Sequence, residues 1–227
     1  KPNVIALQPI DHNTIDASGS WGQKSLMWQF ENIDTIGSLL KVTPEECAAI
    51  RVEKGLFGYN QQILKTQAEY LSRKYNCVVT NPPYFGKGMG DTFKNYVQNV
   101  FPNSKADTMA TFMERCQLFT YDKGYYAMIN MHTWMYLPSY KNLRCTLLES
   151  CIIKSLLHLG PRAFDEISGE VVKSVTFVIN NHAPYESYGN YYRLVEGNSS
   201  AIKESQFFSA KSNKNYFCVN QNVFGRM

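Results

Sequence analysis

The sequence predicts an α/β fold with a mostly parallel sheet and an antiparallel hairpin at one edge of that sheet. Short apolar runs alternate with helical patterns through the middle of the chain, as in parallel strands joined by helices. Two strand-like runs then follow one another directly, which indicates a hairpin. Proline and glycine at the ends of several runs mark the turns between these elements.

The first part of the chain is predicted to be mainly helical. Val4–Leu7 has the composition of a short strand, and a sharp helix start follows at Thr43. The Thr43 hydroxyl can cap this helix, Pro44 fits its first turn, and Glu46 can reach back to the cap amide. A second helix is expected from Ile63 to Lys74, where apolar residues recur on one face.

The alternating elements begin with Cys77–Thr80, a compact apolar run that predicts a buried strand. A helix is expected from Asp91. The other expected helices span residues 107–119, 140–148 and 200–208, and the other expected strands span residues 124–130, 152–159, 171–179, 191–195 and 215–219. The pattern weakens after Asn181, so we expect the tail to begin another unit.

Composition excludes several classes of protein. The chain has 227 residues, of which 44% are hydrophobic and 19% are charged, so it is globular rather than disordered. No apolar stretch approaches the roughly 20 residues that cross a bilayer, and the first residues lack a secretory core. We therefore expect a cytoplasmic protein with no membrane partner. The net charge of +4 permits a polyanionic partner without requiring one.

Cysteine and histidine spacing argues against a metal site. The six cysteines contain no Cys-x-x-Cys pair, and the four histidines have no metal-ligand spacing with them. We therefore expect reduced thiols and no bound metal.

Asn81-Pro82-Pro83-Tyr84 follows the first strand of the alternating region. Ligands bind outside the carboxyl ends of strands in an open α/β sheet, so this tetrapeptide is expected at a binding site. The Asn81 side-chain oxygen and the Pro82 carbonyl are hydrogen-bond acceptors. Neither proline has an N–H and each fixes its φ angle, so the acceptors are held stiffly. Tyr84 supplies a flat aromatic face beside them.

Two rigid acceptors beside a ring suit an aromatic –NH2 group, which has two hydrogens to donate. The lone pair of such an amine is delocalised into its ring, which makes the amine a poor nucleophile. Accepting both N–H bonds in a dry site orients the lone pair toward an electrophile, while Tyr84 stacks on the ring. In this interpretation Asn81, Pro82, Pro83 and Tyr84 form the catalytic corner, and the face of Tyr84 matters more than its hydroxyl.

This residue set resembles the Asn/Asp-Pro-Pro-Tyr/Phe motif of amino-methyltransferases that use S-adenosyl-L-methionine. Residues 76–84 are similar to the fourth strand and catalytic loop of adenine-N6 DNA methyltransferases, and residues 104–116, 124–134 and 158–165 are similar to later segments of that family. Within it, the chain resembles the large methyltransferases of phage-exclusion (BREX) systems, the PglX type, and single-chain restriction-modification enzymes. The resemblance implies a Rossmann-like methyltransferase sheet, of which this chain holds a part.

The resemblance also implies a mechanism and partners. Such enzymes flip the target adenine out of double-stranded DNA, because N6 cannot be reached inside a duplex. The family's second aromatic, opposite the tyrosine, matches Phe164, for which simple core packing is the alternative. Lys87, in a Gly-rich loop, is expected either to contact a phosphate or to lie on a flexible surface loop. Other subunits of a defence system are expected as partners.

The family's Gly-rich cofactor loop is not visible. Asp16–Gly22 is rich in glycine and serine, but no apolar strand precedes it, so we interpret it as a solvated loop. We expect residues 1–75 to be a helical lead-in segment, 76–181 to be the catalytic half of a methyltransferase domain, and 182–227 to extend toward a recognition domain outside this sequence. The cofactor-binding half is expected to be missing, so this piece alone is expected to be inactive.

The leading hypothesis is a site-specific DNA adenine-N6 methyltransferase of a restriction-modification or phage-defence system. The same tetrapeptide serves enzymes that methylate glutamine side chains of proteins or guanine amines of ribosomal RNA, and the acceptor chemistry does not separate them. A third hypothesis is a non-catalytic DNA-binding fragment, because the cofactor residues are not found.

Overall fold

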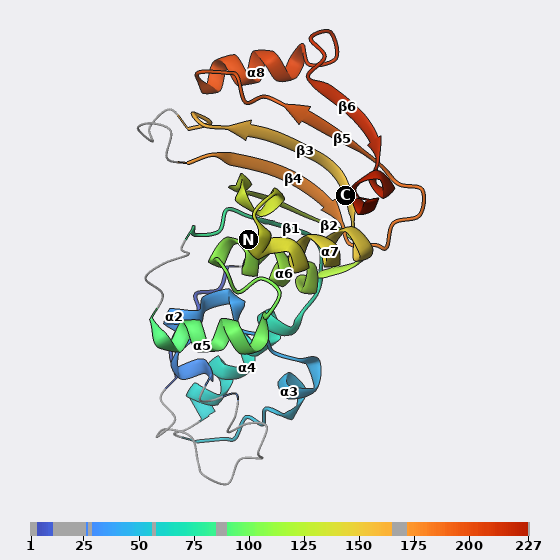
Figure 1. Cartoon of the computed structure of the whole chain (residues 1–227). Coiled ribbons are helices and arrows are strands. Elements are labelled where there is room, and N and C mark those ends of the chain that lie inside the picture. Colours follow the sequence, from blue (N-terminus) through green and yellow to red (C-terminus); the bar gives the residue numbers. More distant parts are fainter. Residues whose placement is uncertain are drawn as a thin grey trace. The chain divides into compact units, whose positions relative to one another are not determined.

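The computed structural model describes residues 4–10, 26, 29–55, 58–84, 90–164 and 172–226. The chain forms two compact units (Figure 1). The first comprises residues 1–74 and 89–100, and the second comprises residues 75–88 and 101–227. The sheet begins where the second unit begins, whereas the expected division into three parts remains a prediction.

The first unit is helical. Its described helices are α2 (Ile33–Ile36), the 3-10 helix η2 (Gly37–Leu39), α3 (Pro44–Ala49), α4 (Gly58–Ser72) and α5 (Asp91–Val100). The helix start expected at Thr43 is confirmed. The Glu46 amide donates to Thr43 Oγ1 at 3.1 Å, and the Thr43 amide donates to Glu46 Oε2 at 2.8 Å. Val4–Leu7 does not form the expected strand, because the described part of this unit offers no strand with which it can pair.

Helix α5 belongs to the first unit although the strand β1 (Tyr75–Thr80) of the second unit precedes it in the chain. The Tyr96 hydroxyl accepts from the Lys41 amide at 2.7 Å and donates to the Leu39 carbonyl at 3.3 Å. Val97 is buried on the same helix. The segment that follows β1 therefore leads from one unit into the other.

The second unit contains a six-stranded sheet in the order β1-β2-β4-β3-β5-β6 (Figure 1). Its other strands are β2 (Thr120–Met131), β3 (Ile152–Gly160), β4 (Ser174–Asn180), β5 (Tyr188–Arg193) and β6 (Tyr216–Asn220). Strands β1, β2, β3 and β5 run in one direction, and β4 and β6 run in the other. The predicted α/β fold with a mostly parallel sheet is confirmed.

Two details of the sheet differ from the sequence-based expectations. The hairpin of β3 and β4 lies inside the sheet rather than at its edge, because β5 pairs in parallel with β3, with Leu156 opposite Tyr191. Strand β1 is not fully buried, and Val79 is 72% exposed. Only the alternate residue Val78 packs against the core, because β1 is an edge strand of the described sheet.

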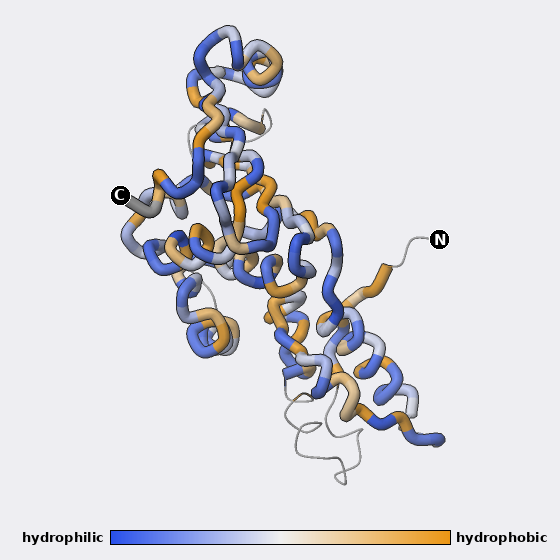
Figure 2. Tube along the Cα trace, turned by 90° about the vertical axis from the view of Figure 1, so that its right-hand side faces the viewer, coloured by the Kyte–Doolittle hydropathy of each residue, from blue (hydrophilic) through white to orange (hydrophobic). Residues whose placement is uncertain are grey.

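Helices α6 (Thr108–Phe119) and α7 (Lys141–Ser150) cover one face of the sheet. Their apolar residues meet the inward-facing residues of β2, β3 and β4 in one cluster. The cluster includes Met109, Met113, Tyr126, Met128, Leu143, Leu147, Val175, Phe177 and Ile179. Figure 2 shows hydrophobic and hydrophilic residues interspersed along the chain. The remaining helices of this unit are η3 (His132–Met135), η4 (Pro138–Tyr140), α8 (Ser200–Phe208) and η5 (Gln221–Arg226).

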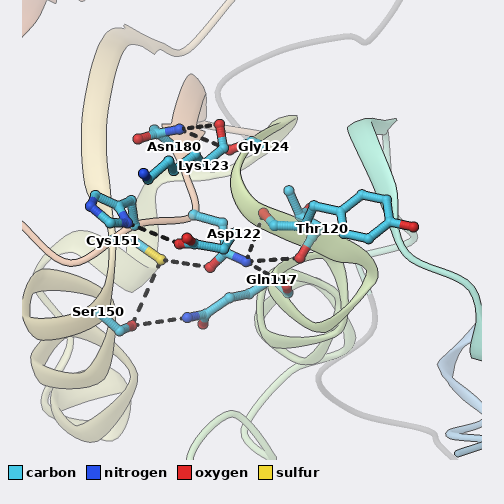
Figure 3. A network of polar contacts seen from close by, with 11 residues as sticks. Gln117, Thr120, Asp122, Lys123, Gly124, Ser150, Cys151 and Asn180 are labelled. Atoms are coloured by element: carbon cyan, nitrogen blue, oxygen red, sulfur yellow. Dashed lines mark hydrogen bonds and ion pairs between the residues drawn. The ribbon is translucent and has the colours of Figure 1, made fainter.

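A network of side-chain amides joins the start of β2 to the end of β4 (Figure 3). Asn181 Nδ2 donates to the Gln117 carbonyl at 3.2 Å and to the Thr120 carbonyl at 2.9 Å. Both carbonyls lie where α6 ends, and the last carbonyls of a helix have no partner within the helix. Asn180 Nδ2 donates to the Lys123 carbonyl at 2.8 Å, at an irregular point of β2 where Lys123 has a φ angle of +63°. The network therefore fixes how α6 turns into β2.

Replacing Asn181 by alanine is expected to lower the free energy of unfolding by about 1–3 kcal/mol, because the Asn181 hydrogen bonds to the Gln117 and Thr120 carbonyls are lost. Urea denaturation of the chain measures this change. The control Asn142→Ala removes an exposed amide from α7 and is expected to stay within about 0.5 kcal/mol of the wild type. Equal losses in the two variants would contradict the capping role of Asn181.

Candidate active site

The carboxyl ends of the four parallel strands lie at one edge of the sheet, where β4 begins. Asn81 directly follows β1, His132 directly follows β2, and Gly160 ends β3. Ligands bind at this edge in open α/β sheets. The topology therefore gathers three groups of polar and aromatic residues that are far apart in the sequence.

The tetrapeptide after β1 is held by the hydroxyl of its tyrosine. The Tyr84 hydroxyl lies 3.1 Å from the Ile129 carbonyl of β2 and 3.0 Å from Asn81 Oδ1, within hydrogen-bonding distance of both. Tyr84 is half-buried and its ring packs against the core cluster. Burial raises the pKa of the Tyr84 hydroxyl above its ordinary value, so the hydroxyl keeps its proton at neutral pH.

The other residues of the tetrapeptide alternate in exposure. Pro82 is buried, whereas Asn81 and Pro83 are exposed. The sequence-based interpretation gave weight to the ring face of Tyr84, and the structure adds two polar contacts of its hydroxyl. The Asn81 side chain is held by its contact with the Tyr84 hydroxyl, and because Asn81 is exposed, a ligand can still reach it.

Phe164 lies in the turn that follows β3. Gly160 has a φ angle of +66°, and a Cβ atom there would come within 3.0 Å of Val195 Cγ1, so this position requires glycine. Arg162 also has a positive φ, of +57°. The turn carries Phe164 in a half-buried position near the end of the described segment. Lys87 lies outside the described residues.

A pair of histidines lies at the same edge and was not predicted from the sequence. His132 Nδ1 and His158 Nε2 are 2.8 Å apart, and the Tyr136 hydroxyl lies 3.4 Å from the same His158 nitrogen. Burial, followed by the positive charges of the neighbouring His132, Arg193 and Lys203, lowers the pKa of His158 to about 4. Burial also lowers the pKa of His132. The two rings therefore share a hydrogen bond as neutral imidazoles at neutral pH.

Trp134, which follows His132, belongs to the core instead. It is buried, its ring meets Phe177 edge-on, and its Nε1 donates to Asn130 Oδ1 at 3.2 Å. The alternation along β2 could separate inward from outward residues, but the contact between His132 and His158 depends on the strand order.

Lys203 fixes α8 to the ends of two strands. Its side chain is only 4% exposed, and its Nζ donates to the Leu159 carbonyl at 2.6 Å and to the Leu194 carbonyl at 2.9 Å. These carbonyls lie at the end of β3 and just after β5. Helix α8 is therefore attached to the sheet at the carboxyl ends of β3 and β5.

The residues that directly follow three of the parallel strands are not acidic. Asn81, His132 and Pro161 directly follow β1, β2 and β3. None of them is the acidic side chain that binds a ribose in nucleotide-binding sheets. Within the described ranges, no group of three His, Cys, Asp or Glu residues could hold a metal ion. Among the same residues, no helix is long and apolar enough to cross a membrane.

Comparisons with known proteins identify the family. The sequence profile of the Eco57I restriction-modification methylase family matches residues 18–164. The chain belongs to this family. The match includes the Asn81–Tyr84 tetrapeptide and Phe164, and the resemblance that these residues indicated is confirmed.

Two curated relatives of this Eco57I-family chain are adenine-specific methyltransferases. PglX of Lacticaseibacillus casei (strain Zhang) is 44% identical over 146 residues, and BrxX of Escherichia coli O9:H4 (strain HS) is 36% identical over 192 residues. The aligned regions cover 64% and 78% of this chain. They cover only 12% of PglX and 16% of BrxX, so the chain spans a small part of the length of these relatives.

Two solved structures share the fold. The Type ISP enzyme LlaBIII bound to DNA has a TM-score of 0.50 and 16% identity, over 74% of this chain and 13% of that one. The DrdV–DNA complex has a TM-score of 0.51 and 13% identity, over 76% of this chain and 20% of that one. At such low identity these matches show the fold alone.

The histidine pair predicts a pH dependence of stability. His158 takes up a proton near pH 6.5 when unfolded and near pH 4 when folded, so the unfolded state binds more protons between these values. The free energy of unfolding is therefore expected to fall as the pH drops from 6.5 to 4. Urea denaturation of the wild type and of His158→Gln measures this, and the variant is expected to lose less stability over the same range. Identical slopes would contradict the low proton affinity of His158.

Proposed function

We propose that the protein containing this chain transfers a methyl group from S-adenosyl-L-methionine to N6 of adenine in double-stranded DNA. It does so as part of a restriction-modification or phage-defence system, in the cytoplasm, where the DNA lies. Family membership and the names of the two curated relatives support this reaction. The observation that carries the proposal is the exposed Asn81 side chain held at a strand end by the Tyr84 hydroxyl.

Asn81 and Pro82 bind the reacting amine. The Asn81 side-chain oxygen and the Pro82 carbonyl each accept one hydrogen of the adenine –NH2 group. These bonds favour electron density on nitrogen and aim its lone pair at the methyl donor. Pro83 keeps the corner stiff because its φ angle is fixed. The methylated ammonium is strongly acidic and loses its proton after transfer, so no base is needed before the attack.

Tyr84 and Phe164 hold the flipped base between them. The Tyr84 ring supports one face of the adenine, and Phe164, on the turn after β3, covers the other. Stacking on an aromatic ring contributes about 1–3 kcal/mol per base, which helps to offset the cost of unstacking the adenine from the duplex. Lys87, in the loop after Tyr84, contacts a DNA phosphate in this proposal.

In this proposal S-adenosyl-L-methionine is bound mainly by other residues, because Asn81, His132 and Pro161, which follow three of the described strands, are not the acidic side chain that binds a ribose. The cofactor supplies the methyl group. In this proposal, DNA recognition and any contacts with other defence-system subunits also use parts of the protein that correspond to the unaligned remainder of PglX and BrxX. The aligned regions are 12% and 16% of these relatives.

Replacing Asn81 by alanine in the complete protein is expected to slow adenine methylation at least about 100-fold, because a positioned acceptor is lost. Sequencing of modified bases in DNA from cells with and without the gene measures the mark, and Asn142→Ala serves as the control. Adenine marks that persist with Asn81→Ala would contradict the mechanism. Unchanged adenine marks together with lost glutamine or ribosomal guanine marks would point to the other amine substrates. A protein that binds DNA without leaving any mark would be a non-catalytic module.

Phe164→Ala is expected to weaken capture of the flipped base about 5- to 100-fold, because one of two stacking faces is lost. Fluorescence of 2-aminopurine at the target position reports how much of the base is extrahelical. Phe164→Leu, which fills the same space without a π face, separates stacking from packing. Full rescue by leucine would show that Phe164 acts in core packing.

A further inference from the structure

The Tyr84 hydroxyl has fewer hydrogens than acceptors. It faces the Ile129 carbonyl at 3.1 Å and Asn81 Oδ1 at 3.0 Å, and both of these oxygens accept. A tyrosine hydroxyl has one hydrogen to donate and lone pairs with which to accept. A single hydrogen shared by two acceptors leaves at least one bond weak.

Rotating the Asn81 side-chain amide by a half-turn, so that its nitrogen and oxygen exchange places, gives the Tyr84 hydroxyl, the Asn81 amide and the Ile129 carbonyl compatible hydrogen bonds. The backbone carbonyl of Ile129 can only accept, so the Tyr84 hydrogen belongs to that bond. The two ends of an asparagine amide have nearly the same shape, and the hydrogen-bond network decides which end faces a neighbour. With Nδ2 turned toward Tyr84, the amide donates to the hydroxyl oxygen. Asn81 Oδ1 then faces away from Tyr84, on the exposed side of the residue.

We propose that the Tyr84 hydroxyl is a positioning group: it donates to Ile129, accepts from Asn81 Nδ2, and thereby keeps Asn81 Oδ1 turned outward to accept from the substrate amine. This inference rests on the proposed function and adds a second role to Tyr84, separate from stacking by its ring. Without the hydroxyl, the amide is free to turn its –NH2 end toward the substrate –NH2, where two donors face each other.

The surroundings of Tyr84 hold this relay, the pair of hydrogen bonds from Asn81 Nδ2 to the Tyr84 hydroxyl and from that hydroxyl to the Ile129 carbonyl, in place. Strand β1 pairs with β2 only as far as Thr80 opposite Met128, so Ile129 lies one residue beyond that ladder. Pro82 and Pro83 have no N–H with which to continue it. The hydroxyl stays protonated because burial raises its pKa. Packing of the Tyr84 ring against the core cluster holds the hydroxyl at the end of β2.

The relay predicts that the hydroxyl matters only when residue 81 is an amide. A carboxylate has two equivalent acceptor oxygens, so aspartate at position 81 offers an acceptor to the substrate in either orientation. The test therefore uses four forms of the complete protein: the wild type, Tyr84→Phe, Asn81→Asp and the double variant. Single-turnover methylation of an adenine-containing duplex at saturating DNA and S-adenosyl-L-methionine gives the rate of transfer for each form.

Tyr84→Phe is expected to slow transfer about tenfold when asparagine stands at position 81, with KM for DNA and 2-aminopurine flipping changed less than about twofold. The same change in the Asn81→Asp protein is expected to alter the rate less than about threefold. Tyr188→Phe, which removes an exposed tyrosine hydroxyl on β5, is the matched control and is expected to leave the rate unchanged. A merely structural role of the hydroxyl would slow transfer equally in the two backgrounds.

Three results would overturn the relay: an unchanged rate for Tyr84→Phe, equal losses in the wild-type and Asn81→Asp backgrounds, or a loss that appears only in KM. If Asn81→Asp proves inactive, the split between kcat and KM in Tyr84→Phe decides the question. The wild-type rate on adenine is measured first. Its absence rejects the proposed function, and the four forms are then compared on whichever amine the wild type methylates.

Discussion

The bond from the Tyr84 hydroxyl to the Ile129 carbonyl is the interaction on which the candidate site depends. Two prolines end β1 and leave the neighbouring β2 without backbone donors at this point. Tyr84 supplies the missing hydrogen from a side chain, three residues after Asn81. The chain can therefore leave the sheet abruptly and remain attached to it. A corner made in this way is stiff, and it places a polar side chain in the open without a flexible loop.

Strand order explains what gathers around this corner. Strand β4 runs antiparallel between β2 and β3, so the carboxyl ends of β2 and β3 lie on either side of its start. His132, after β2, and His158, on β3, are in contact there across β4. The turn at Gly160, which ends β3, leads to Phe164. The Lys203 ammonium donates to the Leu194 carbonyl just after β5, at the same edge of the sheet. One edge thus combines a neutral imidazole pair, aromatic rings and an exposed amide.

Local patterns in the sequence predicted most of the elements, whereas the contacts between distant elements could not be predicted. The helix start at Thr43 and the helix at Ser200–Phe208 follow from capping residues a few positions away. The place of Asn81 at a strand end follows from two prolines. The exposure of Val79 and the interior position of the β3–β4 hairpin depend on which strands pair. The partners of the Tyr84 hydroxyl and of His158 also depend on the order of the strands in the sheet. The sequence of an apolar strand does not indicate which strand will lie beside it.

The burial of Lys203 gives this unit an internal chemical reporter. Its ammonium group is enclosed by two carbonyls, and its stem passes so close to Gly197 that a Cβ atom there would lie 2.7 Å from Lys203 Cγ. Amine-reactive labels reach exposed lysines such as Lys211 and Lys214 at once but reach Lys203 only after α8 lifts from the sheet. The labelling rate of this one side chain, read by mass spectrometry, thus measures how often the α8 end of the sheet opens.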